Sequence, residues 1–342
     1  MILFATATLT PAALIALAAL WGGAWPALAL GYMTVLVFAL DRLVAHSIDN
    51  ADPEAEFPGA QSLLVTLGLG HFALLGLSLW AVGGHAGLGT ASQVMLGIAA
   101  GLVFGQIGHP VAHELIHRPS RALRLLGRLI YTSLLVGHHA SAHLRVHHVH
   151  VASDGDPSTA RLGEGFYRFV LRAGIGAFRA GFRAESDLLR RGGKSWLSHP
   201  YILYVGGGLA FVLVAYVLAG AGGVAAYLAM CVYAQMQILM SDYVQHYGLR
   251  RKTRPDGRLE PVGPRHSWNA PHWYSAALTL NAPRHSDHHV TPLRSYPALQ
   301  LVPDQMPFLP YPLPMMAALS LVPVLWRLVM DHRARQWRDV GG

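Results

Sequence analysis

The sequence predicts an all-α integral membrane protein with a histidine-rich cap on one side of the membrane. Three features predict it, namely the composition, a series of long apolar runs and a clustering of histidines. Of the 342 residues, 53% are hydrophobic and 13% are charged, whereas soluble domains carry about 25% charged residues. The single cysteine, Cys231, excludes a disulfide framework and any site in which several cysteines hold zinc or an iron–sulfur cluster.

Apolar runs of membrane-spanning length alternate with polar segments. A spanning helix needs about 20 mostly apolar residues. Six runs meet this requirement, at residues 2–20, 25–44, 61–82, 93–111, 200–219 and 224–244. The turns WGGAWP, VGGHAGLG and AGAGGV are short, rich in glycine and free of Lys, Arg, Asp and Glu, which predicts three hairpins. The first run lacks a basic n-region, so we expect a retained helix rather than a cleaved signal peptide.

Charged residues lie almost entirely on one side of these hairpins. Arg42 follows the second run, and every other Lys or Arg lies between Arg118 and Lys194 or from Arg250 onward. Because Lys and Arg favour the cytoplasmic side, we expect this side and both termini to be cytoplasmic, in a bacterial inner membrane. The cap is then expected to comprise residues 112–199 and 245–342 of a single domain covering residues 1–342.

Two further apolar segments lie outside the six runs and are not expected to span the membrane. Residues 122–136 are interrupted by Arg124 and Arg128, and a span there would separate neighbouring histidine clusters by about 30 Å. We therefore predict an interfacial or re-entrant segment. The tail at residues 303–326 is broken by prolines (PFLPYPLPMM) and is expected to lie on the surface.

The histidines form three clusters and one singleton, each at the cytoplasmic end of an apolar segment. The motifs are HELIH, HLRVHH, RHSDHH and the His of DYVQHYG. Residues three or four apart share a helix face, so each motif is expected to direct its imidazoles to one point. The nine histidines are His113, His117, His143, His147, His148, His246, His285, His288 and His289.

This spacing predicts metal binding, and the number of imidazoles narrows the choice of site. HELIH fits the H-E-x-x-H motif of zinc proteases, but a catalytic zinc needs three protein ligands and would leave six of the nine histidines unexplained. Imidazole suits zinc, copper, iron and nickel alike. Nine imidazoles suffice for two metals with open positions, and the membrane setting favours a dinuclear iron site. A histidine-lined metal carrier is a further alternative, although carriers place polar ligands along a path through the bilayer.

These motifs resemble those of the membrane alkane hydroxylases, or alkane 1-monooxygenases, which are integral-membrane non-haem diiron enzymes. The resemblance covers about residues 109–290, in HELIHR, HLRVHH with VASDGDPSTARLGEGFYRF, DYVQHYGLRRK, HSWNAPHW and RHSDHH. Fatty-acid desaturases share the design but typically use H-x-x-x-x-H and H-x-x-H-H, whereas this chain has H-x-x-x-H and H-x-x-x-H-H. The chain departs from the family pattern at Asp242, Gln245, Ala282 and Pro283.

The resemblance implies that the nine histidines hold two iron ions, with O₂ as co-substrate. It implies terminal hydroxylation of medium-chain n-alkanes to 1-alcohols, with electrons from rubredoxin and its NADH-dependent reductase. The alternative is a related membrane hydroxylase or desaturase that acts on another lipid or on an aromatic methyl group. We expect the rubredoxin to dock on an arginine-rich face that comprises Arg161, Arg168, Arg172, Arg179 and Arg183.

No carboxylate is among the expected ligands, so nearby acids are expected to offset the metal charge. Glu114, Asp287 and Asp242 are the candidates for accepting the second ring N–H of ligating histidines; the alternative is that they are helix-end acids facing water. Further histidines lie close to the clusters in sequence and are expected to be outer hydrogen-bonding groups rather than ligands. They are His109, His139, His150 and His272. No catalytic residue beyond the metal ligands is expected.

Overall fold

The computed structural model describes residues 1–44 and 47–339, and this part of the chain is helical. Its β structure is limited to three isolated bridges within the described residues. Five helices are long and apolar enough to cross a membrane, at Ile2–Trp21, Trp25–Leu43, Pro58–His85, Thr90–His117 and Pro200–His246. The predicted all-α membrane class is therefore confirmed.

Of the first four long helices, α1 is a single piece, and each of the other three is assembled from consecutive helical pieces that include a π-helical turn. They are α1 (Ile2–Trp21), α2–η1–α3 (Trp25–Gly31, Tyr32–Leu36 and Val37–Leu43), α4–η2 (Pro58–Trp80 and Ala81–His85) and α5–η3–α6 (Thr90–Val103, Phe104–Gly108 and His109–His117). The expected run at 93–111 thus continues to His117 without a break. HELIH consequently lies on the last turns of a long apolar helix rather than in a separate segment.

The remaining helices form the second half of the chain. They are α7 (Arg121–Ser133), α8–η4–α9 (His139–Ala142, His143–His147 and His148–His150), α10 (Phe166–Arg191), η5 (Trp196–Ser198), α11 (Pro200–His246), η6 (Pro264–His266), α12 (Trp273–Leu278), α13 (His285–Val290), η7 (Tyr296–Ala298), α14 (Leu313–Ser320) and α15 (Pro323–Asp339). The last two helices occupy much of the proline-broken tail.

The longest helix, α11, is bent where the AGAGGV turn was expected. Its 47 residues leave the helical conformation at Ala219 and Gly220. Gly220 has a φ of 62°, in the left-handed region that glycine adopts without steric cost. The expected runs at 200–219 and 224–244 therefore occupy two arms of one bent helix.

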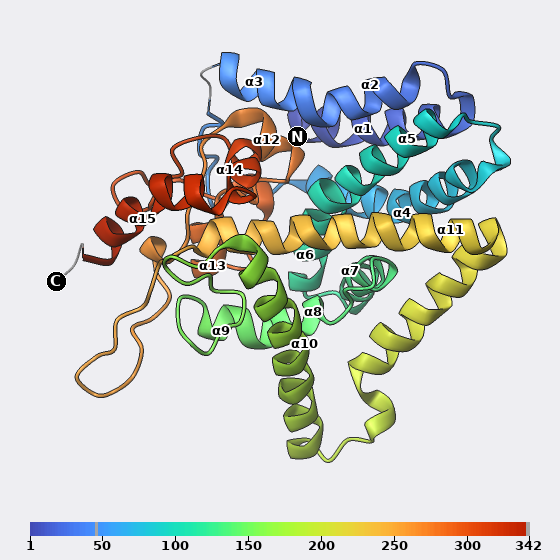
Figure 1. Ribbon diagram of the computed structural model, residues 1–342. Coiled ribbons are helices and arrows are strands. Elements are labelled where there is room, and N and C mark those ends of the chain that lie inside the picture. The colour runs from blue at the N-terminus through green and yellow to red at the C-terminus, as the bar shows by residue number, and fades with distance from the viewer. Residues whose placement is uncertain (45–46, 340–342) are drawn as a thin grey trace.

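The long helices lie side by side, and the histidine-bearing segments gather at one end of them. Figure 1 shows α1, α2, α4, α5 and the second arm of α11 running across the molecule, with the three glycine-rich turns at the right-hand end. The segments from α12 to α15 gather at the opposite end, where α6 and α11 finish. This arrangement brings the ends of two apolar helices into contact with the polar half of the chain.

Glycines allow α5 and α11 to pack closely in the apolar region. A Cβ added at Gly101 would lie 2.7 Å from the Tyr233 ring, and one at Gly105 would lie 2.5 Å from the Gln237 carboxamide. Glycines four residues apart on one helix are a common device for close approach of membrane helices. These two glycines therefore allow the close approach of α5 and η3 to the second arm of α11.

Helix α7 fills the space between α4, α6 and α11 and is seen almost end on in Figure 1. Its last carbonyl groups accept hydrogen bonds from α11: Tyr227 Oη donates to the Ser133 oxygen at 2.6 Å, and Gln235 Nε2 donates to the Leu134 oxygen at 2.8 Å. Carbonyls at a helix end need such partners in an apolar setting. The expected segment at 122–136 is thus a short helix steeply inclined to the spans.

We predict that Gly127→Ala destabilises the protein by about 1–3 kcal/mol, as overpacked cores do. The added Cβ would lie 2.8 Å from the Ala112 carbonyl oxygen on α6, so α6 and α7 would have to separate. The matched control is Gly174→Ala on α10, where nothing lies within 4 Å of an added Cβ and a gain of about 0.5–1 kcal/mol is expected. Thermal unfolding in detergent checks this, and equal stability of the Gly127 variant and the wild type would contradict it.

Candidate metal centre

The nine clustered histidines come from four segments that meet at one end of the long helices. Helix α6 carries His113 and His117 on its last turns, and α11 ends on His246. The segment α8–η4–α9 carries the histidines of HLRVHH, and α13 carries those of RHSDHH. Two apolar helices therefore deliver imidazoles from one side, and two short helices deliver them from the other.

Five of these imidazoles form the first cluster. It comprises His113, His117, His143, His148 and His288, with one ring nitrogen of each lying within 4.8 Å of the others. Nε2 of His143 lies 3.1 Å from Nε2 of His117 and 2.9 Å from Nε2 of His148. Nε2 of His148 lies 3.2 Å from Nε2 of His288. The ring nitrogens thus surround one point.

The other four imidazoles form the second cluster, which is entirely buried. It comprises His147, His246, His285 and His289, again with one ring nitrogen of each within 4.8 Å of the others. Nε2 of His285 lies 3.0 Å from Nε2 of His246 and 3.1 Å from Nε2 of His289. The rings of His148 and His289 lie 4.6 Å apart, so the two clusters are adjacent.

The histidine motifs are divided between the clusters, contrary to the expectation that each motif points at one place. In HLRVHH, His143 and His148 belong to the first cluster and His147 belongs to the second. The reason is the π-helical turn at His143–His147, in which the backbone bonds join residues five apart. In RHSDHH, His288 likewise points to the first cluster. Only HELIH keeps its pair together within the described clusters.

The chemistry of these residues fits metal binding. His113 Nε2 and His147 Nε2 are buried and have no hydrogen-bond partner among the described residues, whereas buried polar atoms are normally paired. Burial, helped by the neighbouring imidazoles, lowers the pKa of His143, His148 and His288 well below its usual value. The neutral imidazole thus favoured is the form that binds a metal. Donor sets of imidazole alone suit iron as well as zinc, copper and nickel.

An aspartate that the sequence analysis missed holds one of these rings. His147 Nδ1 donates to Asp156 Oδ2 at 2.8 Å, and both residues are buried. Asp156 also accepts from the Thr159 hydroxyl at 2.7 Å and from the Ser158 backbone N–H at 3.0 Å. Burial alone would lower the pKa of His147, but the Asp156 carboxylate outweighs burial and raises it. Such a carboxylate fixes the tautomer that leaves Nε2 free for a metal.

The spacing of the second motif contains a signal for this aspartate. Asp156 begins D-P-S-T, in which its carboxylate accepts from the backbone two residues on, as aspartates do at turns. Such a turn nine residues after His147 returns the chain to the imidazole.

The acids expected to support the ligands mostly have cationic partners instead. Glu114 forms an ion pair with Arg118. Asp287 accepts from Arg294 at 2.6 and 2.7 Å and from the Gln300 backbone N–H at 3.0 Å. These acids stand beside ligand candidates in sequence, but their carboxylates hydrogen-bond to arginine. Both are buried, so neither is the water-facing acid of the alternative interpretation.

Asp242 and His272 are the other two residues that were expected to support the metal ligands. Asp242 is buried on α11 and acts on the pKa of His147 as a weaker influence than Asp156. His272 precedes α12 and forms an isolated bridge with Ser47. Of the spare histidines, His139 stacks on His143 with ring centroids 5.5 Å apart, and His109 bonds the Tyr131 hydroxyl at 2.9 Å.

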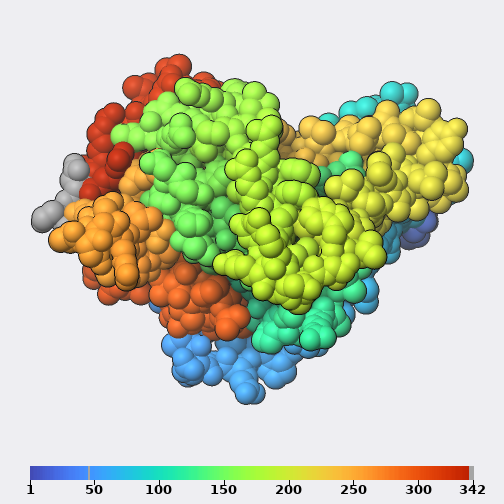
Figure 2. Space-filling view, turned by 90° about the horizontal axis from the view of Figure 1, so that it is seen from below, coloured from blue at the N-terminus to red at the C-terminus, as the bar shows by residue number. Residues whose placement is uncertain are grey.

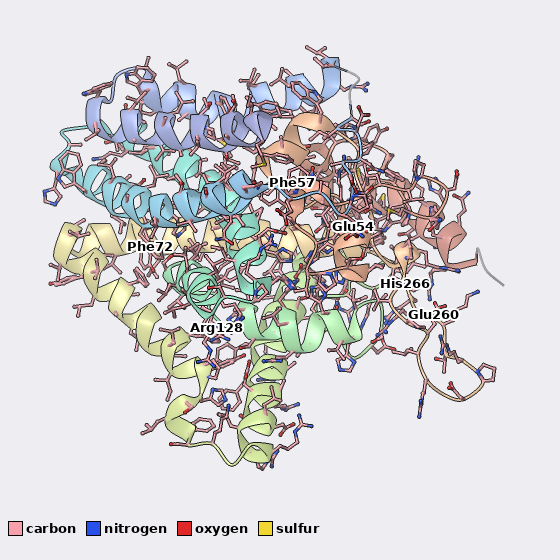
Figure 3. All side chains as sticks on the ribbon, turned by 180° about the vertical axis from the view of Figure 1, so that it is seen from behind. Glu54, Phe57, Phe72, Arg128, Glu260 and His266 are labelled. Carbon is pink, nitrogen blue, oxygen red and sulfur yellow. The ribbon has the colours of Figure 1, made fainter. Side chains whose placement is uncertain are left out.

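The second cluster also rests on the loop that follows α11. Ser267 Oγ lies 3.5 Å from His246 Nδ1. The preceding His266 bonds Glu260 at 3.0 Å, which closes the base of the loop seen at the lower right of Figure 3. The HSWN sequence therefore contributes a contact to the singleton histidine.

Comparison with known proteins gives consistent matches. The family described as fatty acid desaturase matches residues 90–319. Alkane 1-monooxygenase 2 of Pseudomonas aeruginosa is 31% identical over 330 residues, which cover 92% of this chain and 85% of that protein. Alkane 1-monooxygenase 1 of Alcanivorax borkumensis is 34% identical over 78% of this chain, which spans 66% of that protein's length.

A relative with a different name is also similar. The hydroxylase component of the xylene/toluene monooxygenase of Pseudomonas putida is 30% identical over 233 residues, which cover 67% of this chain and 61% of that protein. The matched proteins therefore include monooxygenases named for alkanes and one named for xylene and toluene.

We predict that Asp156→Ala weakens metal binding at the second cluster about 10–100-fold, as loss of a hydrogen-bonded support of a ligand does. Without the carboxylate, the His147 ring loses the partner that fixes its tautomer. Metal content per chain after graded chelator treatment measures the effect. The matched control is Asp154→Ala, since the Asp154 side chain is 84% exposed and pairs with Arg250. Equal metal retention by the Asp156 variant and the wild type would refute the role of Asp156.

Proposed function

This chain belongs to the alkane hydroxylase family of membrane monooxygenases, and we propose that it hydroxylates the terminal methyl group of medium-chain n-alkanes to 1-alcohols. The observation that carries the proposal is the convergence of nine imidazoles into two adjacent clusters at the ends of apolar helices. The names of the related alkane 1-monooxygenases support the choice of substrate.

The nine histidines are proposed to hold two iron ions, one in each cluster. Iron in these clusters would supply the activation of O₂ that breaking an unactivated C–H bond requires, which side chains alone do not provide. The protein contributes neutral imidazoles, the Asp156 carboxylate that orients His147, and a buried setting that limits water. Asp242, beside the second cluster, is proposed to offset part of the metal charge.

The topology that fits this function has six spans in three hairpins, with the two arms of α11 as the last pair. The described chain is then one domain with its histidine-rich cap and termini on the cytoplasmic side of an inner membrane. Helix α10 supports an interfacial position for part of the cap. It exposes an apolar row at Tyr167, Leu171, Ile175 and Phe178, which suits contact with the acyl boundary of the bilayer.

The one cysteine of this sequence does not suffice for a rubredoxin-type iron centre, so electrons are proposed to come from a separate protein. We propose rubredoxin, with its NADH-dependent reductase upstream. Of the five arginines expected to attract it, four are exposed on the segment from Arg161 through α10. Arg172 instead bonds Glu164 and the carbonyl oxygens of Pro157 and Thr159. Figure 2, the view from below, shows the yellow-green end of α10 near the centre.

Two alternatives have specific support. The similarity to the xylene/toluene hydroxylase component favours an aromatic methyl group as substrate, and the match to the fatty acid desaturase family favours desaturation of a lipid. The zinc-protease interpretation of HELIH has lost support, because His113 and His117 share their cluster with three further histidines.

The test is incubation of membranes that contain the protein with rubredoxin, its reductase, NADH and a panel of n-alkanes, a xylene and a fatty acyl lipid. Formation of 1-alcohols from the alkanes, dependent on every component, is the expected result. An alkene as the main product, or oxidation of the xylene alone, would replace the proposal by one of the two alternatives. Metal analysis that finds zinc near one per chain and little iron would reject the diiron site.

We predict that His246→Ala loses one of the two irons and most of the hydroxylase activity, because a four-imidazole cluster would retain three ligands. The change in iron content, from about two per chain toward one, is measured on purified protein. His85→Ala is the matched control, because His85 is exposed in a glycine-rich turn at the far end of the long helices. A His246 variant that keeps both irons and full turnover would overturn the nine-ligand assignment.

A further inference from the structure

A cavity of about 450 Å³ lies beside the first cluster, within the size range of small-ligand sites. Its walls come from η1 and α3, from α5 to α6, from the second arm of α11, from α12 and from α14. Most of the lining is apolar, as at Phe38, Leu102, Met240 and Leu278. Figure 1 shows α12 and α14 beside the end of α11 that carries His246.

The cavity runs along two of the long helices, and one of its lining residues adjoins the metal centre. His109 lines it, and the His109 ring lies 5.9 Å from the ring of His113. Gln106 lines it seven residues before His113, which corresponds to about 10 Å along a helix that rises 1.5 Å per residue. A chain whose methyl end reaches the clusters would therefore pass Gln106.

Gln106 presents hydrogen-bonding capacity to this apolar space. Its Nε2 donates to Gln237 Oε1 at 3.3 Å. Gln237 also lines the cavity, and its own Nε2 donates to the Gly101 and Tyr233 carbonyl oxygens at 2.9 and 3.2 Å. Gln237 is thus satisfied by protein groups. Gln106 retains one N–H and its carbonyl oxygen, for which no hydrogen bond is found in the described part of the chain.

Ser275 is the second such group. It is 1% exposed and lines the cavity, and its Oγ lacks a hydrogen-bond partner within residues 1–44 and 47–339. Other hydroxyls of the lining donate to their own helices: Thr279 Oγ1 to the Ser275 oxygen and Thr34 Oγ1 to the Leu30 oxygen, both at 2.7 Å. Asp41 Oδ1 accepts from the Ser275 backbone N–H at 3.1 Å, which fixes the position of this residue.

We propose that the cavity favours aliphatic chains that carry a hydrogen-bond-accepting oxygen, such as an ether, over plain hydrocarbons. This inference rests on the proposed function and specifies its substrate class. A hydrocarbon that fills the cavity leaves Ser275 Oγ and the free Gln106 N–H unpaired and without water, which is unfavourable. A site with such groups discriminates strongly against an analogue that lacks the matching atom. The ether oxygen accepts from Ser275 Oγ–H or from Gln106 Nε2–H.

The test compares n-alkanes with n-alkyl methyl ethers of the same number of chain atoms, using the iron-loaded protein and its electron donors. The ω-hydroxylated product is scored for each, and the series varies the distance between the oxygen and the reacting methyl group. In the wild type, kcat/KM is expected to favour an ether over its matched alkane at one range of lengths. In Ser275→Ala and Gln106→Leu the ratio of kcat/KM for the ether to kcat/KM for its matched alkane is expected to fall about tenfold.

The matched control is Ser78→Ala. Ser78 is fully buried on α4, its Oγ also lacks a partner among the described residues, and it is not part of the cavity lining. This variant removes an equivalent hydroxyl and is expected to keep the preference of the wild type. Gln106→Leu also breaks the contact with Gln237 and can therefore disturb folding. If the Gln106 variant does not fold, the result for Ser275→Ala alone tests whether the ether preference depends on a polar group of the cavity.

A binding measurement separates this inference from the proposed function. The ether should raise the unfolding temperature of the wild type more than the alkane does, and the difference should vanish in Ser275→Ala. If neither substrate is hydroxylated but this difference is found, the cavity assignment stands and the proposed function fails. If the alkane is hydroxylated while the wild type shows no preference for any ether, or Ser275→Ala keeps it, the inference is wrong.

Discussion

The convergence of nine imidazoles, seven of them buried and two half-buried, on two adjacent points is the constraint on which the rest of the structure depends. Ring nitrogens held about 3 Å apart repel one another unless a proton or a metal lies between them, and burial disfavours the proton. The pKa values of His285 and His289 accordingly lie well below normal, because burial is reinforced by neighbouring imidazoles. The protein therefore holds a donor set that is unfavourable by itself and is stabilised when a metal binds.

The surroundings of the nine imidazoles must be rigid to hold them in place. Close helix packing and hydrogen bonds between segments provide this rigidity. Gly101 and Gly105 let α5 approach α11 closely, while Gly127 lets α7 cross α6. The carbonyls at the end of α7 are bonded by α11. Behind the third motif, the buried Arg284 donates to Asn50 and to the Leu299 carbonyl oxygen, so the segment after α3 is tied to α13. The elements that carry histidines are thus braced from both sides.

The same helices that carry the ligands also line the cavity. Each of α6 and α11 ends on imidazoles, and the preceding turns of both contribute to the cavity wall. The positions of the metal ligands and the shape of the cavity therefore depend on the same two helices. A change in the separation of α6 and α11 would alter both the ligand positions and the cavity. The polar groups at Gln106 and Ser275 are costly in an apolar region unless a ligand or water meets them, which gives their presence a functional interpretation.

Much of this protein could be predicted from the order of its residues. Apolar runs of about the length that a bilayer requires predict the long helices, because hydropathy and length are local properties. Histidines three or four apart predict metal binding for the same reason, and the pair in HELIH does share a cluster. The bend of α11 also follows from local sequence, since Gly220 adopts a positive φ that other residues avoid.

Only the tertiary structure decided how these parts combine. It divided HLRVHH between two clusters through a π-helical turn and brought Asp156 to His147. It also engaged Arg172 internally rather than leaving it free for a partner. The physical reason is that helix periodicity relates neighbours along one segment, whereas contacts such as that of His148 with His288 join residues 140 positions apart. Such contacts depend on how whole helices pack, which no local pattern specifies.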